Sequence, residues 1–320
     1  MTVSRVINHH PNIRPETRKK VMTAIAKIGY EPNQAARVLK GMPNKTIGLV
    51  VPDLSDFFAT CFHAIQTESM NHGYQTLVGV TGRDAAIEDQ QIELMMQNRV
   101  AGLIVVSSGS PLKMLANSKL PVVALDRAIP SLNVDSVTTD NREGAALGTK
   151  HLLEHGHKRI VCLAFEPTMH TVHERIAGYK DAMRDAGLKP KVVDDLGSLA
   201  QVESLVECWS TATDRPTAVF SVQRLTTIRL IQSLYRFKIS VPQQIALVGF
   251  DDFELAEALS SPVSVVAQSP RELSRTAVDI LFRHIESHGN VLQSEPRSVR
   301  MVYPTTLIPR ASCGCEYSSH

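Results

Sequence analysis

The amino-acid sequence predicts an α/β protein in which two lobes of doubly wound parallel sheet follow a small all-α head. From Thr46 onward, short apolar runs alternate with amphipathic helical stretches, which is typical of parallel strands connected by helices. The region 46–320 is longer than one hydrophobic core comfortably holds, so we expect two lobes. The first 45 residues differ, with short helical patterns and a strongly basic charge.

Basic residues are concentrated in this N-terminal segment. The chain of 320 residues has a net charge of +2, but residues 1–45 hold nine Lys and Arg against two Glu. The head therefore carries +7 and the remainder of the chain −5. A basic arm on an acidic body is typical of nucleic-acid binders, although a solvated basic helix would give the same charge run.

The sequence indicates neither a membrane span nor a metal centre. No apolar run approaches the roughly 18 to 20 residues that cross a bilayer, and the apolar core of a signal peptide is missing, so we expect a cytoplasmic protein. The five cysteines are scattered, which suits reduced thiols. Cys313 and Cys315 form a Cys-x-Cys pair without a nearby His or further Cys in the sequence. We therefore expect an incidental tail there, with no metal and no cofactor.

Two short amphipathic helices are predicted in the head. Val3, Val6 and Ile7 give the first an apolar face, and Pro15 suits the first position of the second. Two such helices joined by a turn match part of a helix-turn-helix module. The second helix should end at Gly29 and bury three residues at helical spacing: Val21, Ile25 and Ile28.

The stretch from Asn33 to Gly41 has the features of a hinge. Asn33 can cap a helix, and Gly41 can close it in a left-handed conformation. A helix of at most two turns should be ordered only when something else holds it. Arg37 and Lys40 suggest a polyanion, and Leu39 could be a wedge in a minor groove, although an ordinary linker fits the same residues.

Several segments of the head form a set: Thr2-Val3-Ser4-Arg5-Val6-Ile7-Asn8, Thr17-Arg18 through Val21, Gly29-Tyr30-Glu31-Pro32-Asn33, Ala36-Arg37 and Leu39. Together they resemble the DNA-binding head of the lactose-repressor (LacI/GalR) family, and the similarity covers nearly the whole chain. It implies that residues 2–8 belong to a recognition helix in the major groove and that a dimer pair of hinge helices enters the minor groove. The implied DNA contacts are Thr2, Ser4, Arg5, Asn8, Lys19, Asn33, Ala36, Arg37 and Leu39.

The resemblance also concerns where the chain starts. Met1 falls inside the recognition helix of the family pattern, so the family's first helix is missing. Either the true start lies upstream, or this polypeptide binds DNA poorly. We expect an N-terminally truncated head whose true start lies upstream, because every later feature of the head is intact.

Seven buried strands are predicted in the body from apolar runs: 47–51, 76–80, 103–106, 122–125, 160–164, 218–220 and 245–248. Amphipathic helices fall between them, for example at 87–97, 144–155, 174–186 and 271–288. Ligands in such folds bind at the carboxyl ends of strands. The family resemblance implies, more specifically, a periplasmic-binding-protein-like (type I) clamshell with a small effector in its cleft.

The resemblance implies three parts of the chain. Residues 1–32 would be a partial helix-turn-helix DNA-binding domain, 33–45 a hinge helix and linker, and 46–320 an effector-binding and dimerisation domain. Within the last part, the first lobe would comprise about 46–139 and 270–310, and the second about 140–268. The chain would cross between the lobes near Thr139–Asp140, near Gln268 and near its end.

Polar and aromatic residues after the predicted strands form the candidate effector site. Phe57 and Phe58 can stack on a sugar or base, or pack a helix onto the core. Asp126 can face an effector or pair with Arg127. Arg175 offers a rigid fork of donors, although a surface helix charge is the simpler interpretation of it. The full set, assigned mainly by the resemblance, is Phe57, Phe58, Asp126, Thr171, Arg175, Gln223, Arg224, Asp251 and Gln268.

Gln223 and Arg224 depart from the family, which usually has Asn-Asp at these positions. Replacing an acid with Arg224 reverses the local charge. This change argues against an ordinary neutral sugar and favours an acidic or phosphorylated one.

One enzyme motif occurs in the body. His151-Leu152-Leu153-Glu154-His155 matches the H-x-x-E-H pattern of inverted zinc peptidases and puts both His on one helical face. The segment also fits a helix C-terminus, where His and Gly are favoured, and we prefer that interpretation. No enzyme is therefore expected.

The favoured function is a transcriptional regulator, most simply a repressor, that binds double-stranded operator DNA as a homodimer, with a tetramer left open. Its effector would be a sugar, sugar acid or sugar phosphate. The alternative is a solute-binding protein of the same clamshell fold without DNA binding. The lack of a signal peptide and the +7 head argue against that alternative.

Overall fold

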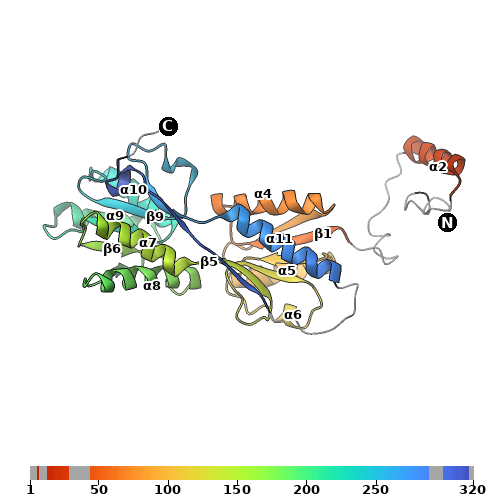
Figure 1. The fold of residues 1–320 in the computed structure, drawn as a ribbon, viewed down its shortest axis with the longest axis horizontal. Helices are drawn as coiled ribbons and strands as arrows, with labels where there is room; N and C mark the ends of the chain where they lie inside the picture. The colour runs from red at the N-terminus through yellow and green to blue at the C-terminus, as the bar shows by residue number, and fades with distance from the viewer. Residues whose placement is uncertain (1–5, 7–12, 29–43, 288–297, 317–320) are drawn as a thin grey trace. The chain divides into compact units, whose positions relative to one another are not determined.

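The computed structural model describes residues 6, 13–28, 44–287 and 298–316 (Figure 1). The chain divides into two compact units, residues 1–45 and residues 46–320. Among the helices in the described ranges, none is both long and apolar enough to cross a membrane.

The described part of the first unit is essentially one helix, α2 (Pro15–Ile28). It begins at Pro15, whose fixed φ suits the first turn, and Lys27 in its last turn complements the helix dipole. None of its residues is buried, and Ile28 is 71% exposed, so the predicted buried stripe is wrong. Val21 and Ile25 are partly buried, and Ile28 is exposed. The predicted recognition helix, apart from the buried Val6, and the hinge lie outside the described residues.

The second unit contains two six-stranded sheets, which confirms the predicted α/β fold. The first sheet is parallel throughout, in the order β11-β5-β4-β3-β1-β2. Its strands are β1 (Thr46–Val51), β2 (Gln75–Val80), β3 (Leu103–Val105), β4 (Val122–Asp126), β5 (Asp135–Thr139) and β11 (Arg300–Tyr303). Its helices are α4 (Asp56–Asn71), α5 (Ala85–Gln97), α6 (Lys113–Ala116) and α11 (Pro270–Ser287).

The second sheet has the order β12-β10-β9-β8-β6-β7 and is parallel except for its edge strand β12. Its strands are β6 (Ile160–Leu163), β7 (Lys191–Val193), β8 (Ala218–Ser221), β9 (Ala246–Phe250), β10 (Ser264–Ala267) and β12 (Thr306–Ile308). Its helices are α7 (Asn141–Glu154), α8 (His170–Asp185), α9 (Leu199–Thr211) and α10 (Arg224–Arg236), with the 3-10 turns η1 (Glu254–Ala256) and η2 (Ala311–Cys313).

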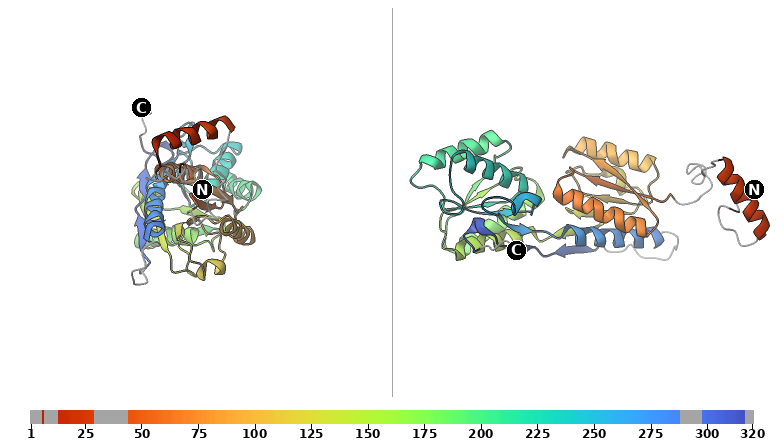
Figure 2. Two further views of the ribbon diagram at one scale, coloured as in Figure 1. Left: turned by 90° about the vertical axis from the view of Figure 1, so that its right-hand side faces the viewer. Right: turned by 90° about the horizontal axis from the view of Figure 1, so that it is seen from above.

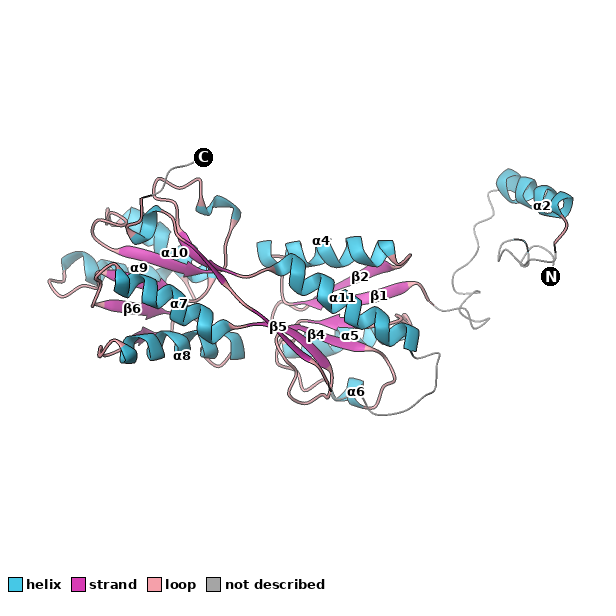
Figure 3. Cartoon of the chain, viewed as in Figure 1, coloured by secondary structure: helices cyan, strands magenta, loops and turns pink. Residues whose placement is uncertain are grey.

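Helices cover both faces of each sheet (Figures 2 and 3). In β1, Leu49 packs in a cluster with Phe58 of α4 and Leu281 of α11, whereas the next residue, Val50, packs in a separate cluster with Ile92 of α5. Successive strand residues point to opposite faces, so a strand buried on both sides must be apolar throughout. The same physical requirement produced the continuous apolar runs from which the strands were predicted.

Within residues 44–287 and 298–316, the chain crosses between the sheets three times. It does so between β5 and α7, between β10 and α11, and between β11 and β12. The third crossing precedes the boundary near residue 310 that the sequence suggested. The reason is that β12 pairs antiparallel with β10 and so belongs to the second sheet. These crossings bring the carboxyl ends of strands from both sheets toward one region.

Candidate functional site

A cavity of about 150 Å³ lies at the carboxyl ends of strands from both sheets, and residues of both lobes line it. All nine residues predicted for the effector site line it: Phe57, Phe58, Asp126, Thr171, Arg175, Gln223, Arg224, Asp251 and Gln268. It shares Phe57, Asp251 and Gln268 with a wider, more open cleft of about 610 Å³. The structure therefore brings the whole predicted set together around one space.

Four residues at or just after strand ends in this region have left-handed backbone conformations. Asp126 (φ 65°) is the last residue of β4, and the others come after β2, β6 and β9: Arg83 (φ 68°), Glu166 (φ 53°) and Asp251 (φ 71°). Non-glycine residues rarely adopt positive φ, and such strain collects at binding and catalytic sites. Here the turns aim the side chains of Asp126 and Asp251 at the cavity that they line.

Arg175 of α8 is the most firmly held polar residue of the site. Its side chain is buried, and its Nε donates to Oδ1 of Asn141 at 2.7 Å. Nη1 donates to the carbonyl of Val222 at 2.8 Å and to Oδ2 of Asp251 at 3.1 Å. The guanidinium also lies over the ring of Phe250, 3.7 Å from its centroid. These contacts fix the fork of donors before any ligand arrives, so the surface-charge interpretation of Arg175 is wrong.

Asp251 and Gln268 form the acceptor side of the cavity. Nε2 of Gln268 donates to Oδ1 of Asp251 at 2.6 Å. Oε1 of Gln268 is buried and has no hydrogen-bond partner among the described residues. A buried acceptor without a partner costs free energy, so a ligand hydroxyl that donates to this oxygen would be favoured.

Asp126 both faces the cavity and pairs with its neighbour. Its carboxylate is buried and accepts from Nε of Arg127 at 3.2 Å, while Nη1 of Arg127 donates to the carbonyl of Ser107 at 2.8 Å. Burial raises the pKa of Asp126, and the charges of Arg127 and Arg175 oppose that increase. The two interpretations of Asp126 offered from the sequence are therefore compatible.

The two phenylalanines differ in exposure. Phe58 is buried in the core with Leu49, whereas Phe57 is half-buried and meets Phe58 edge-on at 5.1 Å between ring centroids. Phe58 therefore serves mainly to pack α4 onto the core, whereas Phe57 exposes more of its ring for stacking against a ligand.

Gln223 and Arg224 both have partners. Oε1 of Gln223 accepts from the backbone N–H of Phe165 at 2.8 Å. Nη1 of Arg224 lies 3.7 Å from Oδ2 of Asp56, so an ion pair joins α10 of the second lobe to α4 of the first. The charge that Arg224 adds to the cavity is thus partly offset by Asp56.

Sequence reasoning missed several charged residues that line the cavity. They are Asp53, Arg83, Arg127 and Arg229. Arg83 pairs with Asp53 at 3.0 Å and with Glu166, in the other lobe, at 3.4 Å. A signal exists for Asp53, Arg83 and Arg127, because polar residues that shortly follow a strand tend to lie at the ligand edge of the sheet. Arg229 lies within α10 and has no such signal.

Of the nine predicted DNA contacts, the structure describes only Lys19, which is exposed on α2. The other eight lie outside the described residues: Thr2, Ser4, Arg5, Asn8, Asn33, Ala36, Arg37 and Leu39.

Comparison with known proteins identifies the kind of protein that carries this cavity. A family described as periplasmic binding protein-like domain matches residues 149–313, and one described as bacterial regulatory proteins, lacI family, matches residues 1–33. The HTH-type transcriptional repressor PurR of Photobacterium profundum is 31% identical over 297 residues, which cover 90% of this chain and 89% of that protein. This chain belongs to the LacI family of bacterial regulatory proteins.

Two further proteins are similar to this chain over most of its length. The ribose operon repressor of Haemophilus influenzae is 32% identical over 297 residues, which cover 89% of this chain and 88% of that protein. A solved complex of the transcriptional regulator CelR with cellobiose is 28% identical, with a TM-score of 0.72, and covers 97% of this chain and 94% of that one.

The chain is therefore a LacI-family repressor with an N-terminal helix-turn-helix region and a periplasmic-binding-protein-like body, and it is not an enzyme. The prediction of a DNA-binding regulator is confirmed. The alternative of a solute-binding protein is set aside, because residues 1–33 match the DNA-binding family.

Proposed function

We propose that this repressor responds to a sugar or sugar derivative that binds in the cavity lined by Arg175, Asp251 and Gln268. The observation that carries the proposal is the preorganised pairing of the Arg175 fork with the Asp251 carboxylate at 3.1 Å, beside a buried Gln268 oxygen that lacks a partner among the described residues. A sugar hydroxyl both donates and accepts, so it can satisfy such neighbouring donors and acceptors together.

Other features of the cavity suit a carbohydrate. Phe57 offers a half-buried aromatic surface, and the carboxylates of Asp126 and Asp251 are acceptors for hydroxyl groups. The CelR structure holds cellobiose, and one relative is named a ribose operon repressor. Both are similar to this chain over most of its length, which favours a ligand of the same chemical class here.

The charges favour an effector that carries an acidic group. Five Arg and three Asp line the cavity. Three of the Arg pair with those three Asp: Arg83 with Asp53, Arg127 with Asp126 and Arg175 with Asp251. The other two are Arg224, beside Asp56, and Arg229, which donates to the carbonyl of Leu196 at 3.2 Å. We therefore infer a sugar acid or sugar phosphate rather than a neutral sugar.

We propose the same role for each part of the chain as the sequence predicts. Residues 1–32 would bind operator DNA, 33–45 would form the hinge, and 46–320 would bind the effector and a second copy of the chain. The ion pairs Arg83–Glu166 and Arg224–Asp56 join the two lobes beside the cavity. A ligand that strengthens or breaks these ion pairs would bind one arrangement of the two lobes more tightly than another. It would thereby shift the population toward the arrangement that it binds better.

A thermal-shift screen of neutral sugars, sugar acids and sugar phosphates on the full chain tests the ligand class. A bound ligand stabilises the fold by about 2.7 kcal/mol at a hundredfold excess over its Kd. We expect an anionic compound to raise the Tm, and Arg224→Ala to weaken its binding about tenfold, because one charged hydrogen bond is lost.

Arg236→Ala is the matched control, since Arg236 lies on the same helix but pairs with Glu203 and does not line the cavity. It should leave the Kd unchanged. If only a neutral sugar shifts the Tm, and Arg224→Ala leaves that shift intact, the anionic part of the proposal fails.

A further inference from the structure

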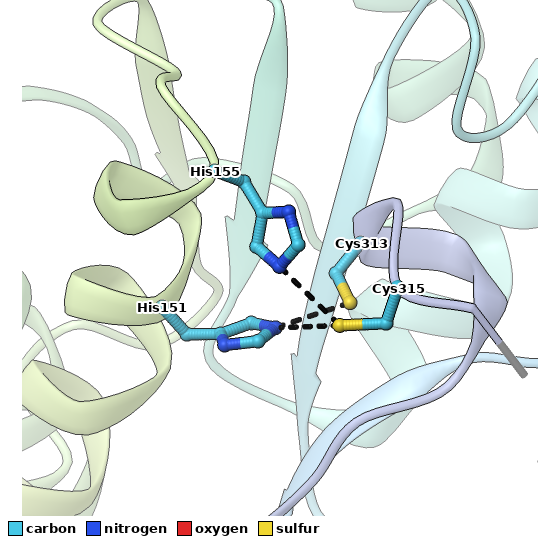
Figure 4. A group of neighbouring side chains, drawn as sticks. All are labelled: His151, His155, Cys313 and Cys315. Carbon is cyan, nitrogen blue, oxygen red and sulfur yellow. Dashed lines mark hydrogen bonds between the residues drawn. The ribbon is translucent and has the colours of Figure 1, made fainter.

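Four side chains that bind metals well meet at one end of the second lobe. His151 lies on α7 and His155 is the residue that caps its C-terminal end, whereas Cys313 and Cys315 lie in the C-terminal segment around η2 (Figure 4). The ligand atoms of these four residues all lie within 4.8 Å of one another. In the sequence, the two histidines and the two cysteines lie far apart, and neither pair alone predicts a metal site. The fold changes that interpretation, since it brings together residues about 160 positions apart.

The separations between these atoms match a tetrahedral metal site. Nε2 of His151 lies 3.1 Å from Sγ of Cys313 and 3.5 Å from Sγ of Cys315. Nε2 of His155 lies 3.3 Å from Sγ of Cys315. Zinc bonds of about 2.3 Å to sulfur and about 2.05 Å to nitrogen, at tetrahedral angles, place N and S about 3.6 Å apart. Shifts of up to about half an ångström would bring these three N–S separations to that value, and the remaining separations among the four ligand atoms are at most 4.8 Å.

Local backbone structure explains how each pair converges. His151 and His155 are four residues apart on a helix, which puts their side chains on one face. Between the cysteines, Gly314 has φ 97°, a left-handed conformation that glycine adopts without strain. That turn directs both thiols toward α7, as Figure 4 shows.

The segment that presents the cysteines is anchored in the core. Cys313 is fully buried, and Oγ of Ser312 donates to the carbonyl of Leu247 at 2.6 Å and accepts from the N–H of Ser264 at 2.8 Å. Arg310 donates to both carboxylate oxygens of Asp252 at 2.9 Å. The cysteine ligands are thus held in place without the metal, which reduces the ordering that binding requires.

We propose that His151, His155, Cys313 and Cys315 bind one Zn²⁺ as a structural site. Thiolate and imidazole ligands in a tetrahedral set select zinc over hard cations such as Mg²⁺ and Ca²⁺. Four protein ligands fill the coordination sphere and leave no position for an activated water, so the H-x-x-E-H segment does not act as a peptidase here.

The site's place in the fold indicates its role. His155 follows the C-terminal end of α7, whereas Asn141, which holds Arg175 at the cavity, begins the same helix. At 1.5 Å per residue the two ends are about 20 Å apart, so the ion does not contact an effector. Bound zinc would instead fasten the C-terminal segment to α7 and stabilise the second lobe.

Metal analysis of the purified full chain tests the proposal. After loading with Zn²⁺ and removal of free metal, we expect one zinc per chain. The double variant Cys313→Ser/Cys315→Ser should lose it, and His155→Ala, at an exposed position that the fold tolerates, should bind at least tenfold more weakly. Cys208→Ser and His63→Ala change exposed residues outside the cluster and should each retain one zinc.

Two further readouts separate a built site from adventitious surface binding. Chelation should lower the Tm of the parent chain by on the order of 5 °C, and Zn²⁺ but not Mg²⁺ should restore it. Cobalt substitution should produce the visible absorption of thiolate-bound tetrahedral Co²⁺, which the double cysteine variant lacks. Zinc content that stays the same in the double variant, a parent chain that retains no zinc, or a Cys313–Cys315 disulfide found by intact mass would each overturn the proposal.

Discussion

Replacing Arg175 with Ala is expected to abolish effector binding and to lower the stability of the second lobe. Arg175 supplies the donors that fix Asn141 and Asp251, and its side chain and that of Asp251 are only 5% and 18% exposed. Removing one partner of such a pair leaves the other charge poorly solvated, which costs about 3–5 kcal/mol. For a protein of this size that loss corresponds to a Tm about 10 °C lower.

Two variants separate effector binding from stability. Arg175→Lys keeps the charge but not the planar fork, so it should recover much of the Tm and little of the effector affinity. Arg142→Ala removes an exposed arginine that pairs with Asp181 and should change neither the Tm nor the effector affinity. An Arg175→Ala protein that still binds the effector within twofold of the parent Kd would show that the cavity has been assigned to the wrong residues.

Binding to operator DNA is expected to be steeply dependent on salt. The head carries a net charge of +7 in residues 1–45, so a dimer could readily neutralise six or more phosphates. The slope of log K against log salt is about −0.9 per phosphate neutralised, and 6–10 contacts lose about 10³- to 10⁵-fold in affinity between 50 and 200 mM salt.

The measurement is fluorescence anisotropy with promoter DNA from the chain's own locus, over a series of salt concentrations. The control is residues 46–320, a compact unit by itself, which should show no such binding. A slope near zero for the full chain would mean that the basic head does not contact the phosphate backbone.

Most of the strands that were predicted from the sequence are buried on both faces. The exception is β2, an edge strand that is largely exposed, and the short buried strand β10 (Ser264–Ala267) was not predicted. β1 and β4 are continuous apolar runs, because helices cover them from both sides. β5 (Asp135–Thr139) was missed because its sequence, DSVTT, is mostly polar, although it is buried between β4 and β11. β7 and β12 were missed because each has only three residues and lies at a sheet edge, where the partner strand rather than the local pattern decides the structure.

The predicted cavity residues came largely from family resemblance, and the fold brings them together. Sequence reasoning could not find the links between lobes, such as Arg83 with Glu166, because these depend on how two separate sheets face each other. The His151 and Cys313 cluster was missed for the same reason. Neither the histidine pair nor the cysteine pair alone predicts a metal site. They come together because β12 pairs antiparallel with β10, which places Cys313, shortly after β12, beside His151 of α7.

If a ligand in the cavity controls DNA binding by the head, the affinity of the full chain for its promoter DNA must depend on that ligand. Anisotropy titrations of the full chain with its promoter DNA would be made with and without the compound that raises the Tm, at one fixed salt concentration. Coupling free energies between sites usually change affinity about 5- to 150-fold, so the account predicts a change in the DNA Kd of at least fivefold that Arg175→Ala abolishes. A DNA Kd that is the same with and without a ligand known to occupy the cavity would contradict the account.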